Sequence, residues 1–222
     1  MPNASESFSN QRNKKKHMAR YAYIATPNTN SIVTTAECKT HLRVDYSDDD
    51  TYIANLALAA KETIEDYTNR KLLATNVIQY CDTWNDAYLL YFSPISDITR
   101  VEYYNTSNVL TTLSTDVYDK NIYGTPSTIT LAPSKTFPAV SERARPILVK
   151  YTAGYADASS VPMALKQACL ILVAQWYENR LPYVQGRIVS EIPMTATYLM
   201  NRYKVYGLGM DYINYYNDST NV

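Results

Sequence analysis

The sequence predicts an α+β fold that is mainly helical: a helical bundle with a small antiparallel β subdomain inserted between its second and third helices. Three observations support this prediction. Apolar residues recur at helical spacing within residues 48–71, residues 168–174 are apolar without interruption, and residues 73–156 contain short segments rich in β-branched and aromatic residues. We expect one domain over residues 32–206, with helices at about 35–43, 48–71, 162–180 and 193–206.

The first two predicted helices have clear start signals. Thr34 stands three residues before Glu37, the spacing of a capping box in which a hydroxyl and a carboxylate each accept a hydrogen bond from a backbone N–H group. Asp48, Asp49 and Asp50 lie where the second helix begins, and negative charge is favourable at that end. Within the second helix one apolar stripe predicts a buried face. It consists of Ile53, Leu56, Ala57, Ala60, Ile64 and Tyr67.

Residues 73–156 are predicted to form an antiparallel β meander. Short extended segments alternate there with turn material that contains Pro, Gly, Asn and Asp. The connections are too short for crossover helices, which favours antiparallel strands over βαβ units. The predicted strands are residues 77–81, 88–92, 98–104, 129–131 and 147–151.

The helix predicted at residues 162–180 is the one around which the bundle packs. Pro162 suits a helix start, because its missing N–H would have no intrahelical partner there. The apolar run at residues 168–174 covers the whole circumference of a helix, so it requires covering by its own domain or also by a neighbouring copy. The run is shorter than the roughly 20 apolar residues that span a bilayer, so we expect no membrane contact. We interpret Cys169 as a small core residue.

Both ends of the chain are predicted to lie outside this domain. Residues 1–31 are rich in Ser and Asn and then basic, which is typical of a disordered arm. The arm is either a solvated tail or a contact for phosphate or for an acidic surface. Its candidate contacts are Arg12, Lys14, Lys15, Lys16 and Arg20. Residues 207–222 form a Tyr-rich tail that is too short to fold alone, and we expect it to dock on a partner.

Composition and motifs argue against catalysis. Lys and Arg (21 together) balance Asp and Glu (21 together), which gives no overall attraction to nucleic acid. Three cysteines without a C-x-x-C pair and two histidines predict no metal site. The sequence contains no Gly-x-Ser-x-Gly motif and no phosphate-binding glycine loop, so we expect no enzyme and no cofactor. Tyr is the outlier, with 22 copies that serve either interfaces or an ordinary core.

Three stretches of the sequence, taken in order over about residues 34–204, carry a family resemblance. The first runs from Thr35 to Asp45 and continues through residues 48–50 into the helix that ends near Arg70. The second is residues 94–104, and the third runs from residue 149 through Trp-Tyr-Glu-Asn-Arg at residues 176–180. Together they resemble the head–tail connector proteins of tailed bacteriophages, also called adaptor or head completion proteins. The chain departs from that pattern in its basic arm and in its long tail.

The resemblance implies a structural, non-enzymatic role. Members of this family are similar in forming a ring, commonly of twelve copies, that extends the DNA channel from the portal and seats the tail or stopper protein. For this chain the resemblance implies a homo-oligomeric ring in the neck of a virion, between capsid and tail, after synthesis in the host bacterial cytoplasm. The implied partners are the portal protein and a tail or stopper protein. DNA is expected to pass through the channel without sequence-specific binding.

Within such a ring, two sets of residues are candidates for contacts. Trp, Tyr and Arg dominate the energetics of interfaces. The contact between copies, or the core just beneath it, is therefore assigned to Trp176, Tyr177, Arg180, Tyr67 and Arg70. For Trp176 the core is the favoured interpretation. The portal-binding tail is assigned to Tyr206, Met210, Tyr212, Ile213, Tyr215 and Tyr216.

Two functions of other classes stay open. In one, the chain is a nucleic-acid-binding accessory protein that uses the basic arm at residues 12–20. In the other, it is a β-rich recognition module whose Tyr-bearing strands, within residues 73–156, bind a carbohydrate or a protein surface.

Overall fold

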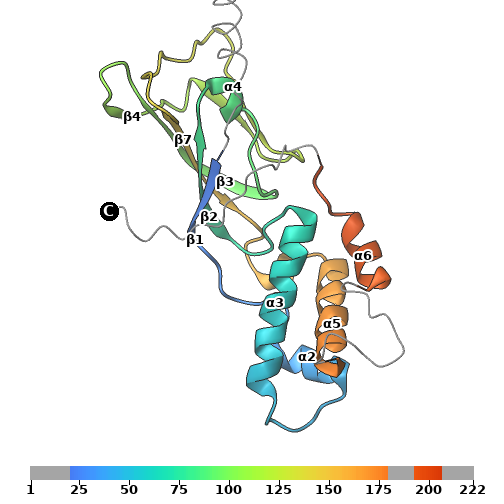
Figure 1. The fold of residues 1–222 in the computed structure, drawn as a ribbon. Helices are drawn as coiled ribbons and strands as arrows, with labels where there is room; N and C mark the ends of the chain where they lie inside the picture. The colour runs from blue at the N-terminus through green and yellow to red at the C-terminus, as the bar shows by residue number, and fades with distance from the viewer. Residues whose placement is uncertain (1–20, 180–192, 207–222) are drawn as a thin grey trace, which may run out of the picture.

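The computed structural model describes residues 21–179 and 193–206, which form a β lobe and a helical lobe (Figure 1). The described helices are α2 (Thr35–Leu42), α3 (Asp50–Thr68), α4 (Trp84–Ala87), α5 (Met163–Glu178) and α6 (Met194–Asn201), with a 3₁₀ turn at Ala158–Ser160. The described strands are β1 (Tyr21–Thr26), β2 (Thr75–Cys81), β3 (Ile95–Tyr104), β4 (Leu110–Thr112), β5 (Tyr118–Asn121), β6 (Thr128–Leu131) and β7 (Ile147–Ala153).

The β lobe is built on a five-stranded antiparallel sheet with the order β1-β2-β7-β3-β4. Strands β5 and β6 form a separate two-stranded sheet. The central strand β7 pairs with both neighbours, with Tyr151 opposite Val77 of β2 and Val149 opposite Val101 of β3. Buried side chains of these strands form a core of their own, which also includes Val205 from beyond α6.

The prediction of a helical bundle with a small β insert is wrong, because the five-stranded sheet is central to the molecule and has its own core. A meander pairs strands in sequence order, whereas β7 lies between β2 and β3. The composition of residues 1–31 predicts a disordered arm, whereas residues 21–26 form the edge strand β1 against β2. These pairings are long-range, and local periodicity does not report them.

The helical lobe packs α5 between α3 and α6, with α2 across one end (Figure 1). Its core is apolar: Ile53 and Ile64 come from α3, and Leu165, Cys169 and Leu172 come from α5, all fully buried. The burial of Cys169 confirms its interpretation as a core residue. None of the helices in the two described ranges is both long and apolar enough to cross a lipid bilayer.

The predicted capping box at the start of α2 is confirmed. The Thr34 hydroxyl accepts a hydrogen bond from the Glu37 backbone N–H at 3.1 Å, and the Glu37 carboxylate accepts one from the Thr34 backbone N–H at 2.6 Å. At the other end of the helix, Arg43 adopts the left-handed conformation that closes many helices.

Within the described residues, the helical lobe buries one face of the apolar helix α5 fully and the other only in part. Leu165, Ala168 and Leu172 are fully buried, whereas Leu170 and Ile171 on the outer face are only half-buried. The outer face therefore keeps apolar surface accessible for a further contact.

Candidate assembly surface

The end of α3 anchors the last described residues of the chain. Asn69 is the left-handed C-cap of α3, and its side-chain amide donates a hydrogen bond to the Val205 carbonyl at 3.0 Å. The Val205 backbone N–H donates to the Thr68 carbonyl at 2.9 Å. Arg70 Nε donates to the Tyr203 carbonyl. These bonds fix the point from which residues 207–222 depart.

Two of the residues assigned to the ring contact lie at this anchor. The Tyr67 hydroxyl donates to Asn201 Oδ1 at 2.6 Å, and the Lys204 ammonium lies 4.5 Å from the centre of the Tyr67 ring. Burial lowers the pKa of Arg70, which is half-buried. Tyr206, assigned to the portal-binding tail, is exposed, and its ring lies 5.6 Å from Lys204 Nζ. Tyr67 and Arg70 therefore contact the chain's own C-terminal segment.

Two other residues assigned to the ring contact lie at the far end of the helical lobe. The Tyr177 hydroxyl donates to Asp49 Oδ2 at 2.6 Å and lies 2.8 Å from the Tyr46 hydroxyl. The hydrogen bond to Asp49 holds the hydroxyl proton and raises the pKa of Tyr177 above its ordinary range. The Tyr177 ring lies 6.1 Å from that of Tyr52. Trp176 is half-buried and packs against the helical core.

The structure thus separates four of the five residues that sequence reasoning placed at one interface. Tyr177 contacts Tyr52 near the start of α3, whereas Tyr67 lies near its end, about 22 Å further along the helix at 1.5 Å per residue. The remaining assigned residues lie outside the described ranges. They are Arg180, the arm residues Arg12, Lys14, Lys15, Lys16 and Arg20, and the tail residues Met210, Tyr212, Ile213, Tyr215 and Tyr216.

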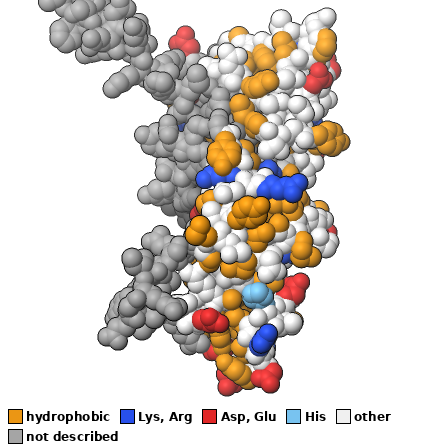
Figure 2. All heavy atoms as spheres, turned by 90° about the vertical axis from the view of Figure 1, so that its right-hand side faces the viewer, with side chains coloured by type: hydrophobic (Ala, Val, Ile, Leu, Met, Phe, Trp, Pro, Cys, Tyr) orange, Lys and Arg blue, Asp and Glu red, His pale blue; other side chains and the backbone are white. Residues whose placement is uncertain are grey.

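Sequence reasoning missed the exposed apolar residues of α5 and α6. Met194 and Tyr198, four residues apart on α6, are 86% and 81% exposed, and Met163 at the start of α5 is 73% exposed. Figure 2 shows hydrophobic side chains gathered across the middle of the face that carries α6, with Lys and Arg side chains among them. The signal in the sequence was the spacing: Ala196 and Met200 are buried, so Met194 and Tyr198 face outwards. Exposed apolar patches of this kind mark protein–protein contacts.

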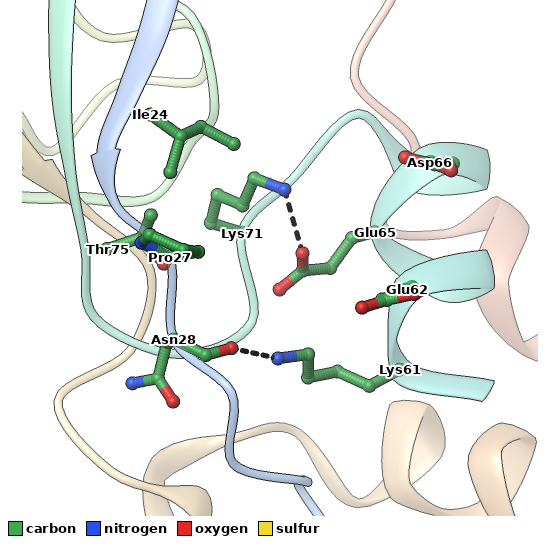
Figure 3. Close-up of a pocket in the computed structure, with 9 residues that line it drawn as sticks. All are labelled: Ile24, Pro27, Asn28, Lys61, Glu62, Glu65, Asp66, Lys71 and Thr75. Atoms are coloured by element: carbon green, nitrogen blue, oxygen red, sulfur yellow. Dashed lines mark hydrogen bonds and ion pairs between the residues drawn. The ribbon is translucent and has the colours of Figure 1, made fainter. Parts of the chain in front are cut away.

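A polar pocket of about 310 Å³ lies between α3 and the segment that follows β1 (Figure 3). The buried Lys61 ammonium donates to the carbonyl oxygens of Asn28 and Asn30, the latter at 3.0 Å. Burial lowers the pKa of Lys61, an effect opposed by the nearby Glu65. Lys71 Nζ lies 2.8 Å from Glu65 Oε2. These groups attach the β1 segment to the helical lobe, and within the described ranges no group of His, Cys, Asp and Glu could hold a metal ion.

Three solved structures that share this fold come from gene transfer agent (GTA) particles. A chain from the neck of an empty GTA particle, computed with C6 symmetry, matches with a TM-score of 0.66 and 21% identity over 84% of this chain and 96% of that chain. A chain from the virion of the native GTA particle matches with a TM-score of 0.68 and 21% identity over the same shares. A chain from the neck of the native particle, computed with C12 symmetry, matches with a TM-score of 0.61 and 18% identity over 83% and 96%. At these identities the likeness establishes the fold alone.

No curated protein sequence matches the chain. The family model described as head completion protein matches residues 31–188, from the segment before α2 to beyond the end of α5. The match covers more than half of the 222 residues and confirms the resemblance drawn from the three sequence stretches, together with the structural, non-enzymatic class. The chain belongs to the head completion protein family.

Proposed function

We propose that this chain is the subunit of a ring in the neck of a tailed-phage-like particle, between the portal and the tail. The match of residues 31–188 to the head completion protein family carries the proposal. The shared fold with neck chains that were computed with C6 and C12 symmetry supports it, because those symmetries are those of rings. We infer twelve copies, a number compatible with the C12 symmetry with which the native GTA neck was computed.

The exposed apolar surface on the helical lobe supports a subunit that is covered by neighbours. Met163, Met194 and Tyr198 are largely exposed, and Leu170 and Ile171 of α5 are half-covered. In a closed ring every copy repeats the same heterologous contact, so a weak contact is multiplied around the circle. The outer face of α5 and α6 is the natural place for part of that contact.

The proposed partners are the portal, a tail or stopper protein, and the DNA that passes through the channel. The bonds from Asn69 and Arg70 to residues 203–205 give the tail a fixed origin, which supports its assignment to the portal. The balance of basic and acidic residues gives no overall attraction to DNA, which supports a channel through which DNA passes without being held. An isolated β module is less well supported, because residues 73–156 lack both β1 and the core residue Val205.

Negative-stain electron microscopy of the full chain, alone and mixed with the portal protein of the same genome, tests this proposal. We expect rings, formed either alone or on the portal. The matched variant lacks residues 207–222: it is expected to keep the fold and to lose portal binding. A full-length chain that stays monomeric in both samples would contradict the proposed function.

A further inference from the structure

We propose that neighbouring copies in the ring join by two helix faces: an outer stripe of α6 on one copy meets an outer stripe of α3 on the next. The α6 stripe consists of Met194, Tyr198 and Arg202. The α3 stripe consists of Asn55, Ala59, Glu62 and Asp66. This inference rests on the proposed ring function and names its contact surfaces.

The α6 stripe is apolar with a basic end. Met194, Tyr198 and Arg202 are spaced by four residues, so they lie on one side of the helix. The opposite side, with Ala196 and Met200, is buried against the helical core. Met194 and Tyr198 are 86% and 81% exposed, and Arg202 is exposed at the helix end. A Met, a Tyr and an Arg on one surface are the residue types that protein interfaces favour.

The α3 stripe has a small side chain, Ala59, in its middle and two acidic side chains towards the C-terminal end of the helix. Its four members follow one another at spacings of three and four residues and are all exposed. They lie opposite the side of α3 that buries Ile53, Ala57 and Ile64. Ala59 leaves room for a large apolar side chain of a partner. Glu62 and Asp66 lie at the rim of the pocket in Figure 3 and supply two negative charges within one turn.

The two stripes are complementary in charge, and their charged ends lie at similar positions along the ring axis. Arg202 is the basic end of one stripe, and Glu62 and Asp66 are the acidic end of the other. Within one copy the bond from Tyr67 to Asn201 ties the end of α6 to the end of α3. Rotation about the ring axis leaves the position of every atom along that axis unchanged. The basic end of α6 in one copy and the acidic end of α3 in the next therefore lie at similar positions along the axis.

Charge reversal in the full-length chain tests this pairing by sedimentation velocity over a range of concentrations, with and without portal. Glu62→Lys and Arg202→Glu each place like charges together, and we expect each to raise the concentration at which rings form by about tenfold or more. The double variant restores opposite charges at positions 62 and 202, with Asp66 unchanged beside them, and we expect it to assemble at a lower concentration than either single variant. Because both side chains are exposed, thermal melting of all variants should stay unchanged.

Glu142→Lys is the matched control, because it makes the same charge change at an exposed position in the β lobe. It should assemble like the unmodified chain. Rings that form equally well with either single reversal, or a double variant no better than the weaker single one, would overturn this interface and leave the ring function standing. An unmodified chain that forms no ring, alone or with portal, would overturn both.

Discussion

Lys71 Nζ lies 2.8 Å from Glu65 Oε2, and the two side chains are each only 7% exposed. Glu65 belongs to α3, and Lys71 lies in the segment that leads from α3 to β2. The second carboxylate oxygen of Glu65 accepts the backbone N–H of Leu72 at 2.9 Å. The pair therefore stabilises the junction where the helical lobe meets the β lobe (Figure 3).

We expect Glu65→Ala and Lys71→Ala each to lower the free energy of unfolding by about 3–5 kcal/mol, because each leaves a buried charge without its partner. The double variant Glu65→Leu/Lys71→Met should lose less free energy of unfolding than the two single variants lose together. Neither of its two new side chains is charged, so no charge of the pair stays buried. Urea denaturation measures all three. Lys39→Ala is the control: it removes a more exposed pair with Asp50 and should cost less than about 1 kcal/mol. If Glu65→Ala and Lys71→Ala lose no more unfolding free energy than this control, the role assigned to the pair is contradicted.

Gly154 follows β7 and has a φ of +103°, a conformation that side chains rarely adopt. A Cβ there would overlap the Leu73 carbonyl oxygen. Gly154→Ala combines backbone strain with a clash, and we expect it to cost about 3 kcal/mol or more in unfolding free energy. Gly124→Ala, where the nearest contact is 3.2 Å and φ is not in the positive region, should cost less. Equal melting temperatures for the two variants would refute this account of Gly154.

The capping box of α2 predicts a pH dependence. Hydrogen bonds from the Thr34 backbone N–H and hydroxyl lower the pKa of Glu37 below its ordinary value of 4.5. Such a carboxyl stabilises the fold fully when the pH is above its ordinary, unfolded-state pKa of 4.5. This stabilisation is lost as the pH falls through the lower pKa of the folded state. Glu37→Gln should therefore flatten the decline of stability below about pH 4.5. Thr34→Ala should cost about 1 kcal/mol at pH 7. Identical acid-side profiles for Glu37→Gln and the unmodified chain would contradict this.

The variant Trp176→Ala distinguishes a role of Trp176 in the core from a role in the contact between copies of the ring. Trp176 is half-buried and packs on the helical core, so we expect its truncation to lower the unfolding free energy by roughly 3 kcal/mol and to prevent ring formation as a consequence. Thermal melting and sedimentation velocity on one sample measure both effects. A variant that melts normally but stays monomeric would place Trp176 in the ring contact, and one that melts normally and forms rings would exclude both roles.

Features that local sequence patterns encode could be predicted. The capping box at Thr34 and Glu37, the buried stripe of Ile53, Ala57 and Ile64, and the burial of Cys169 depend on neighbours in sequence, and the structure contains all of them. The sheet depends on pairings between distant strands. The insertion of β7 between β2 and β3, and the recruitment of β1 to the edge, leave no local signal, so the size of the sheet was underestimated.

The candidate surface could be predicted only in part, for a related reason. The types Trp, Tyr and Arg pointed to Trp176, Tyr177, Tyr67 and Arg70, but residue type does not say which partner a side chain reaches. The structure pairs Tyr177 with Asp49 and Arg70 with the Tyr203 carbonyl. Conversely, the exposure of Met194 and Tyr198 depends on which side of α6 is buried, and that is decided by tertiary packing.

The most direct test of the central claim is a cryo-electron microscopy map of the neck in the assembled particle that contains this chain. We predict a closed ring between portal and tail whose repeating subunit fits the five-stranded sheet and helices α2, α3, α5 and α6. A neck in which another protein fills that position, with this chain elsewhere in the particle or missing from it, would contradict the claim.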